Sequence, residues 1–181
     1  MEWENVVAGQ KADPKQINKI GNQVAKYKGL RLAAQVIVPD GSVQPTIEID
    51  KYTDGSPLHS ELGGELLCYS GENANITTAL GYLQINGITA PDYWGTVAQP
   101  AGAFSFGYWG NVSTEVFGSI RVLNKNVIVK VQSTARYELG GAMKMYGGGL
   151  TTPQTAVTAI KLFLSTGTFS AGTVVEWWER G

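Results

Sequence analysis

From residue 30 onward, apolar and polar side chains alternate with a period of about two, which is typical of β-strands with two different faces. The apolar positions of Ala159–Leu164 alternate with Lys161, and Met143 and Met145 alternate with Lys144 in the same way. One face of each segment is therefore expected to be wet. Nine such segments follow one another, with turn residues between them: Leu30–Val38, Thr46–Asp50, Glu65–Ser70, Thr77–Ile85, Gly118–Leu123, Asn126–Thr134, Gly141–Tyr146, Ala159–Leu164 and Thr173–Glu179.

The alternation favours antiparallel sheets, because parallel sheets covered by crossover helices consist of continuous apolar runs. After Gly29 no helical segment is long enough for such a crossover, and Gly147–Gly149 is interpreted as a flexible connection. We therefore expect an all-β chain, an antiparallel jelly-roll β-sandwich over residues 30–181 preceded by a short N-terminal α-helix. At this size the domain buries about two thirds of its unfolded surface.

Residues 1–29 differ from the rest and form the predicted N-terminal attachment segment. Asp13-Pro14 offers a helix N-cap followed by proline at the first helical position, and Gly29 ends the segment. An apolar stripe at spacings of three and four residues runs along this helix: Ile17, Ile20, Val24 and Tyr27. Isoleucine at both core positions of a coiled coil favours three strands, so one interpretation is a homotrimer interface. The other is a helix lying on its own domain, because so short a helix needs a covered stripe.

Charge and composition exclude several classes of function. Fourteen Lys and Arg face fifteen Asp and Glu, so there is no broad field to attract nucleic acid or an anionic membrane. Cys68 and His59 are single copies, which excludes an internal disulfide and a Cys/His zinc site, and we expect Cys68 to be buried. The apolar runs are short and the first residues do not match a signal peptide. We expect synthesis in a cytoplasm, no membrane insertion and no cofactor.

Catalytic motifs are scarce. As the single histidine, His59 would have to belong to any Ser/His/Asp catalytic triad, but the chain has no Gly-x-Ser-x-Gly nucleophile elbow. His59 is therefore expected on a solvated loop. Gly147–Gly149 also lacks the residues of a phosphate-binding loop. A glycosidase needs two carboxylates that face each other across a cleft. With fifteen acidic residues in the chain, candidates are expected by chance: Glu61, Glu65, Asp92 and Glu115. We predict that the chain is not an enzyme.

Three pairs of adjacent aromatic residues are the more informative set. Tyr93-Trp94 and Tyr108-Trp109 are flanked by Gly and Pro, as loop residues are, and exposed rings of this kind stack on sugars or anchor protein interfaces. These four are the candidate glycan-binding residues. Trp177-Trp178 lies in a predicted strand, where neighbours face opposite sides, so one is expected in the core and the other exposed.

Two motifs resemble a β-sandwich module of tailed-phage virion proteins. The run Val157–Val174 contains Thr-x-Ile-x-Leu, then Ser-Thr-Gly-x-Phe-x-x-Gly-Thr, and is similar to the closing hairpin of that module. Gly167 can turn the chain with positive φ, Phe169 can pack over the hairpin, and Gly172 can release it into the last strand. Upstream, Thr77–Gly87 followed by Tyr93 looks like the module's Leu-x-x-Asn-Gly strand and turn.

The opening residues Val7–Asp13 are similar to segments that open phage fibre proteins. The resemblance implies a structural virion component, often trimeric: a head fibre, decoration protein or tail fibre displayed on the particle surface. Its implied partners are further copies of itself, other virion proteins contacted through residues 1–29, and host-surface polysaccharide. Two alternatives stay open, a carbohydrate-binding receptor-recognition module at the tail tip and, more remotely, a polysaccharide depolymerase.

Overall fold

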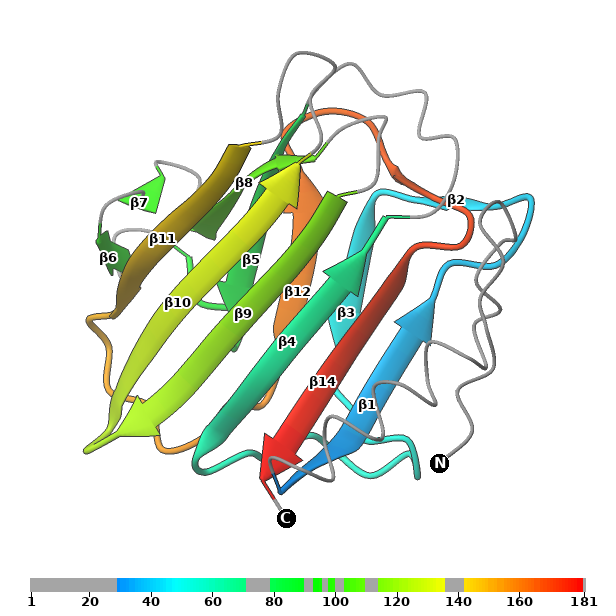
Figure 1. Cartoon of the computed structure of the whole chain (residues 1–181). Helices are drawn as coiled ribbons and strands as arrows, with labels where there is room; N and C mark the ends of the chain where they lie inside the picture. The colour runs from blue at the N-terminus through cyan, green and yellow to red at the C-terminus, as the bar shows by residue number, and fades with distance from the viewer. Residues whose placement is uncertain are drawn as a thin grey trace, which may run out of the picture.

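The computed structural model describes residues 29–70, 79–89, 93–95, 98–99, 103–109, 114–135 and 142–180. Within these ranges the chain forms strands and turns without a helix, and every strand pairing is antiparallel (Figure 1). The all-β prediction is confirmed. The predicted N-terminal helix and its stripe of Ile17, Ile20, Val24 and Tyr27 lie outside the described residues.

Seven strands form the larger sheet, which faces the viewer in Figure 1. In spatial order they are β1 (Leu30–Ile37), β14 (Val174–Arg180), β4 (Gly63–Tyr69), β9 (Thr114–Leu123), β10 (Asn126–Ala135), β11 (Ala142–Leu150) and β6 (Tyr93–Gly95). The first and last long strands of the described chain are therefore neighbours at one edge.

A five-stranded sheet lies behind the larger one (Figure 1). Its order is β3 (Thr46–Ile49), β12 (Ile160–Leu164), β5 (Ala79–Ile85), β8 (Ala103–Trp109) and β7 (Ala98–Gln99). A separate pair joins β13 (Phe169–Ser170) to β2 (Val43–Gln44).

One hydrophobic core fills the space between the two sheets. Each sheet contributes the residues of one face, as the alternation predicts, because successive side chains of a strand point to opposite sides. The fully buried large side chains come from both layers: Ile47, Leu83, Ile85, Phe104 and Phe106 from the five-stranded sheet, and Leu66, Ile120, Leu150 and Trp177 from the seven-stranded sheet.

All nine predicted strands are present, as β1, β3, β4, β5, β9, β10, β11, β12 and β14. The structure adds β8 and the short strands β2, β6, β7 and β13. Tyr108 and Trp109, expected in a loop, lie in β8, where they pair with Leu80 and Ala79. Gly and Pro around this segment indicated a loop, and the paired neighbour β5 overrides that local preference.

The interpretation of Gly147–Gly149 as a flexible connection is wrong, because all three residues belong to β11. Close packing requires glycine at two of them, Gly148 and Gly149. A Cβ at Gly148 would lie 2.6 Å from the Phe104 ring, and one at Gly149 would lie 2.2 Å from the Val127 carbonyl oxygen. Neither distance is sterically possible, so glycine allows the edge of this sheet to approach its neighbours.

The closing motif does not form the expected hairpin. β12 pairs with β3 and β5 in the smaller sheet, whereas β14 pairs with β1 and β4 in the larger one. Residues 165–173 therefore cross from one sheet to the other. Gly167 has the predicted positive φ, at 81°, and Gly172 has a φ of 76°. Phe169 is fully buried, although there is no hairpin for it to pack over.

Asn86 and Gly87 form the predicted turn after β5, with φ values of 55° and 66°. The Asn86 side chain holds the segment that leads into β12. Its Nδ2 donates to Gln154 Oε1 and to the Ala156 carbonyl, each at 2.8 Å, and its Oδ1 accepts from the Thr158 backbone N–H at 2.7 Å. This asparagine is therefore a structural anchor as well as a turn residue.

The expectation that one of Trp177 and Trp178 is exposed is wrong. Trp177 and Trp178 are both buried, at 0% and 2% exposed, although they point to opposite sides of β14. Met145, which alternates with Lys144, is 73% exposed. It pairs with Gln132 and lies on the side of β10 and β11 that faces away from the core. Alternation identifies two faces, and tertiary packing decides which of them is covered.

Candidate functional site

Two glutamates of β14 act as internal hydrogen-bond acceptors. Glu176 is 2% exposed, and its two carboxylate oxygens accept from Gln35 Nε2 at 2.7 Å and from Trp178 Nε1 at 3.0 Å. On the opposite face, Glu179 Oε1 accepts from Trp177 Nε1 at 2.8 Å. Each carboxylate thus satisfies the N–H of a buried indole, which needs a partner because burial without one is costly.

Neither glutamate was predicted from the sequence, although the sequence contains a signal for both. Residues two apart share a face of a strand, so the run Glu176-Trp177-Trp178-Glu179 gives each face of β14 one acid and one indole. A carboxylate beside an indole in a β-strand indicates a buried acceptor for its N–H.

Glu65 of β4 is the third buried glutamate. It is 8% exposed and forms an ion pair with Arg121 of β9 through Oε1. Its other oxygen, Oε2, is buried and has no hydrogen-bond partner among the described residues. Burying a carboxylate oxygen without a hydrogen bond costs free energy, so a further hydrogen-bond donor to Oε2 would be favourable.

The other candidate catalytic residues are dispersed. His59 is exposed on its loop, as predicted, and its Nε2 lies 3.7 Å from Oε1 of the exposed Glu61. Glu115 is exposed on β9, and Asp92 lies outside the described residues. Among the described residues, no group of three or more His, Cys, Asp or Glu side chains could hold a metal ion.

Two tyrosines have raised pKa values. Burial raises the pKa of Tyr52, and the charge of Glu179 adds to this, while the hydrogen bond that the His59 backbone N–H donates to Tyr52 Oη at 3.3 Å opposes it. Burial also raises the pKa of Tyr69 to about 12, with the nearby charges of Glu176 and Glu115 adding to the effect.

Tyr69 is expected to make the fold sensitive to alkali. Because its pKa is higher in the folded chain than in the unfolded chain, where it is about 10, the unfolded chain loses this proton first. The contribution to stability is complete below about pH 10 and is lost as the pH rises through about 12. Urea unfolding between pH 10 and about 12 measures this loss. The free energy of unfolding should fall more steeply with pH for the unsubstituted chain than for Tyr69→Phe. Equal slopes would contradict the shift.

Cys68 is buried, as predicted, at 1% exposed in β4. Burial raises the pKa of its thiol well above the usual range, so the reactive thiolate is suppressed.

We expect Cys68 to react with a thiol reagent about a thousandfold or more slowly in the native chain than in urea, because labelling must wait for the core to open. The exposed Thr166→Cys variant provides the control, since its added thiol should react at once. Rapid labelling of Cys68 in the native chain would contradict its place in the core.

The structure separates the candidate glycan-binding residues. Tyr93 is 7% exposed, and its hydroxyl accepts a hydrogen bond from the Ile85 backbone N–H at 2.9 Å, so it is a core residue. Trp94 is 49% exposed, and its indole lies over Gly149, where an added Cβ would be 3.1 Å from Nε1. Tyr108 and Trp109 follow in β8, which pairs with β5 rather than with β6.

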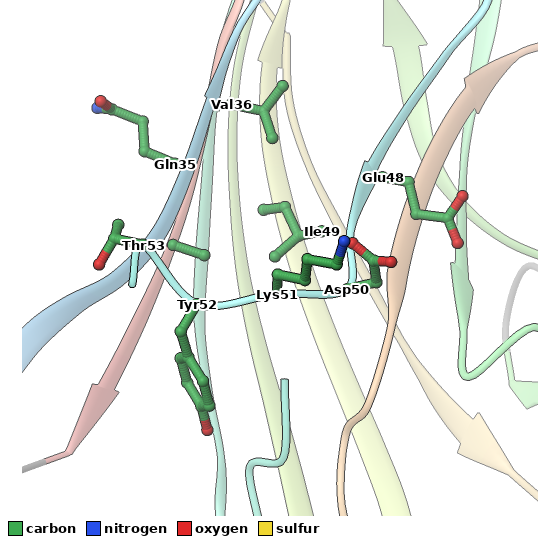
Figure 2. Close-up of a pocket in the computed structure, with 9 residues that line it drawn as sticks. Gln35, Val36, Glu48, Ile49, Asp50, Lys51, Tyr52 and Thr53 are labelled. Atoms are coloured by element: carbon green, nitrogen blue, oxygen red, sulfur yellow. The ribbon is translucent and has the colours of Figure 1, made fainter. Parts of the chain in front are cut away.

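Two small hollows lie beside the Tyr52–Thr53 segment. One, of about 180 Å³, opens between β1 and β3, and Figure 2 shows Val36 and Ile49 on its two sides with Glu48, Asp50 and Lys51 along β3 and the following loop. The other, of about 260 Å³, is lined by residues that include Arg31 and Asp54. Both are below the roughly 300 to 1,000 Å³ of ordinary small-molecule pockets. They do not coincide with any residue singled out from the sequence.

The described part of the chain contains no helix with the length and hydropathy of a membrane span. Its most distinctive polar feature is the set of buried glutamates on β4 and β14, and Trp94 presents an aromatic ring that is 49% exposed. Comparisons with protein-family models, with curated proteins and with solved structures found no match to this chain.

Proposed function

We propose that this chain is a structural protein of a tailed-phage virion, a jelly-roll module displayed on the particle surface as a head fibre, decoration protein or tail fibre. The observation that carries the proposal is the architectural use of the two motifs that resemble phage modules. Asn86 anchors the segment before β12, and the buried Phe169 lies where the chain crosses between sheets. Residues that maintain the architecture of a module are expected at anchoring and buried positions of this kind.

The jelly-roll assignment draws support from the path of the chain. Two antiparallel sheets face one another, and consecutive strands repeatedly change sheet, as β3, β4, β5 and β6 do. Such crossing connections are typical of jelly rolls. The exception here is β9, β10 and β11, which follow one another within the larger sheet.

The proposal includes a homotrimer, made in the host cytoplasm and joined to other virion proteins through residues 1–29. Native mass spectrometry of the purified chain is expected to show a trimer, and immunogold electron microscopy with antibodies against it should label intact phage particles. A stable monomer that labels no part of a particle would overturn the proposal.

Glycan recognition is the second candidate function, favoured by the exposure of Trp94. An indole held against the glycine backbone of β11 presents one open face, which suits stacking on a sugar ring. Tyr93 is not part of this surface, because it is buried.

A glycan array with the native chain and with Trp94→Ala tests this second function. We expect binding that is lost in Trp94→Ala and kept in Leu123→Ala, which removes a comparably exposed apolar side chain elsewhere. No binding by the native chain, or equal binding by all three proteins, would exclude it.

The depolymerase alternative has the least support. Glycoside hydrolysis needs two carboxyl groups facing a substrate across a cleft. Glu176 and Glu179 are instead occupied by indole and amide donors, and Glu65 is paired with Arg121. Turnover of a capsule or cell-wall polymer by the purified chain would reverse this order of preference.

A further inference from the structure

The seven-stranded sheet has a face directed away from the core, here called the outer face, and the β6 edge of this face carries an exposed indole. β6, β11 and β10 lie side by side at this edge (Figure 1). Tyr93 pairs with Leu150, and both side chains belong to the core. The next pair, Trp94 and Gly149, therefore lies on the outer face, because successive positions of a strand alternate.

Beside the indole, β11 has an outer-face position without a side chain. Gly147 shares the face of Gly149, because the two residues are two apart in one strand. Among the described residues beyond its chain neighbours, the atom nearest to a Cβ added at Gly147 is the Val129 carbonyl oxygen, at 4.0 Å. At Gly148 and Gly149 such a Cβ would instead collide with neighbouring atoms. Gly147 therefore leaves a gap in the layer of outer-face side chains.

Lys130 of β10 lies across this gap. It pairs with Gly147 and is exposed, and its chain neighbours Val129 and Val131 are buried in the core, so its side chain is on the outer face. Within the described ranges Lys130 forms no ion pair. Strand register gives it no acidic neighbour on this face, since the positions opposite and diagonal to it are Gly147, Ser119, Met145, Gly149, Phe117 and Arg121. Its ammonium group is therefore available to an anion.

The indole and the ammonium group are spaced for a single ligand. One strand, β11, separates β6 from β10, so the axes of β6 and β10 are about 10 Å apart. Ile128 is the β10 residue level with Trp94, and Lys130 is two residues, or about 7 Å, further along. The Cα atoms of Trp94 and Lys130 thus lie roughly 12 Å apart, on a diagonal that crosses β11 where it has only glycine. A sugar ring can lie on this bare strand between the two side chains.

We propose that Trp94, the bare strand at Gly147, and Lys130 together bind an acidic sugar residue of a polysaccharide. The indole stacks on the apolar face of the sugar ring, and the Lys130 ammonium group pairs with the sugar carboxylate. A neutral sugar would use the indole and leave the ammonium group without a partner. This inference rests on glycan recognition, the second candidate function above, and names the class of sugar.

A glycan array tests that class of sugar. Acidic bacterial capsular polysaccharides are printed beside their carboxyl-reduced forms, in which a hydroxymethyl group replaces each carboxylate on the same backbone, and beside neutral glycans. We expect the native chain to bind acidic forms and expect reduction to weaken this binding about tenfold or more, because a charge-assisted hydrogen bond is lost.

The possible failures on this array are distinguishable. Equal binding to acidic and carboxyl-reduced forms, or binding to neutral glycans alone, would overturn this inference and leave glycan recognition standing. Absence of binding at every spot would exclude glycan recognition itself, and this inference with it.

Lys130→Gln tests the cation. It should weaken binding to the acidic forms about tenfold and leave binding to the carboxyl-reduced forms unchanged, because only the carboxylate loses its partner. Lys51→Gln is the matched control, since Lys51 is an exposed lysine in the loop after β3 and should leave binding intact. Equal binding by both variants to the acidic forms would overturn the role of Lys130.

Gly147→Val tests the gap by filling it. No described atom opposes the added Cβ, and valine suits a strand, so thermal unfolding should show a native midpoint. Binding to the acidic forms should nevertheless fall about tenfold or more, because the side chain occupies the place of the sugar ring. A folded Gly147→Val variant that binds like the native chain would overturn the proposed position of the sugar. If this variant does not fold, Lys130→Gln still decides the proposal.

A single-stranded oligo-dT probe separates a sugar from a nucleic acid, whose bases also stack on indoles. Nucleic-acid binding depends on neutralising several phosphates, and this site offers one unpaired cation, so we expect no binding of oligo-dT at physiological salt. Binding of oligo-dT that is lost in both Trp94→Ala and Lys130→Gln would overturn the proposal and assign the site to nucleic acid.

Discussion

Replacing Trp177 by alanine is expected to lower the free energy of unfolding by about 3–5 kcal/mol, the cost of removing a large aromatic side chain from a close-packed core. Trp177 is fully buried between the sheets, and Ala34 and Leu66 flank it on the adjacent strands. Truncation would also leave the buried Glu179 carboxylate without the indole N–H, 2.8 Å away, that it now accepts from. Urea unfolding followed by far-UV circular dichroism measures the loss.

Trp94→Ala provides the matched control, because it removes the same side chain from a site that is 49% exposed. Its loss in the free energy of unfolding should be near 1 kcal/mol, because a partly solvated side chain contributes less to stability than a buried one. Similar losses in the two variants would contradict the placement of Trp177 at the centre of the core.

Gly64→Ala is expected to be strongly destabilising for so small a substitution, with a cost of about 2–4 kcal/mol or loss of soluble protein. An added Cβ would lie 2.3 Å from the Trp178 carbonyl oxygen and 2.7 Å from Cζ2 of Trp177. The first contact is with backbone, so a rotamer change cannot relieve it. Thermal unfolding of the variant measures the effect.

Gly118→Ala on the neighbouring strand β9 is the control for this substitution. Its Cβ would lie 3.4 Å from the Leu66 Cβ and 3.8 Å from its next neighbours, which is ordinary van der Waals contact. Its stability should change by less than about 1 kcal/mol, since alanine also restricts the unfolded chain. If both glycines tolerated alanine equally, the close approach of β14 to Gly64 would be wrong.

Local chemistry predicted much of the fold. Period-two alternation identified all nine of the longer predicted strands, and the residues with special backbone demands, Asn86, Gly87 and Gly167, behave as their types require. The burial of Cys68 followed from its apolar neighbours in β4. These features depend on residues close together in sequence, so the sequence is sufficient to specify them.

The candidate site was harder to predict. Tyr93 and Trp94 are adjacent and equally aromatic, yet one is buried with its hydroxyl bonded to Ile85 and the other is half exposed at a sheet edge. Neither local composition nor flanking Gly and Pro distinguishes them, because exposure depends on which strand lies next to β6.

The amino-acid sequence by itself determined that this chain forms antiparallel strands with two unlike faces, because alternation along a strand is a local property of its residues. Only the tertiary structure decided that β12 and β14 lie in different sheets, that both Trp177 and Trp178 are buried, and that Glu176 serves as an internal acceptor. Partner strands and covering layers come from residues far away in the chain, and the energy of those contacts appears only when the sheets have assembled.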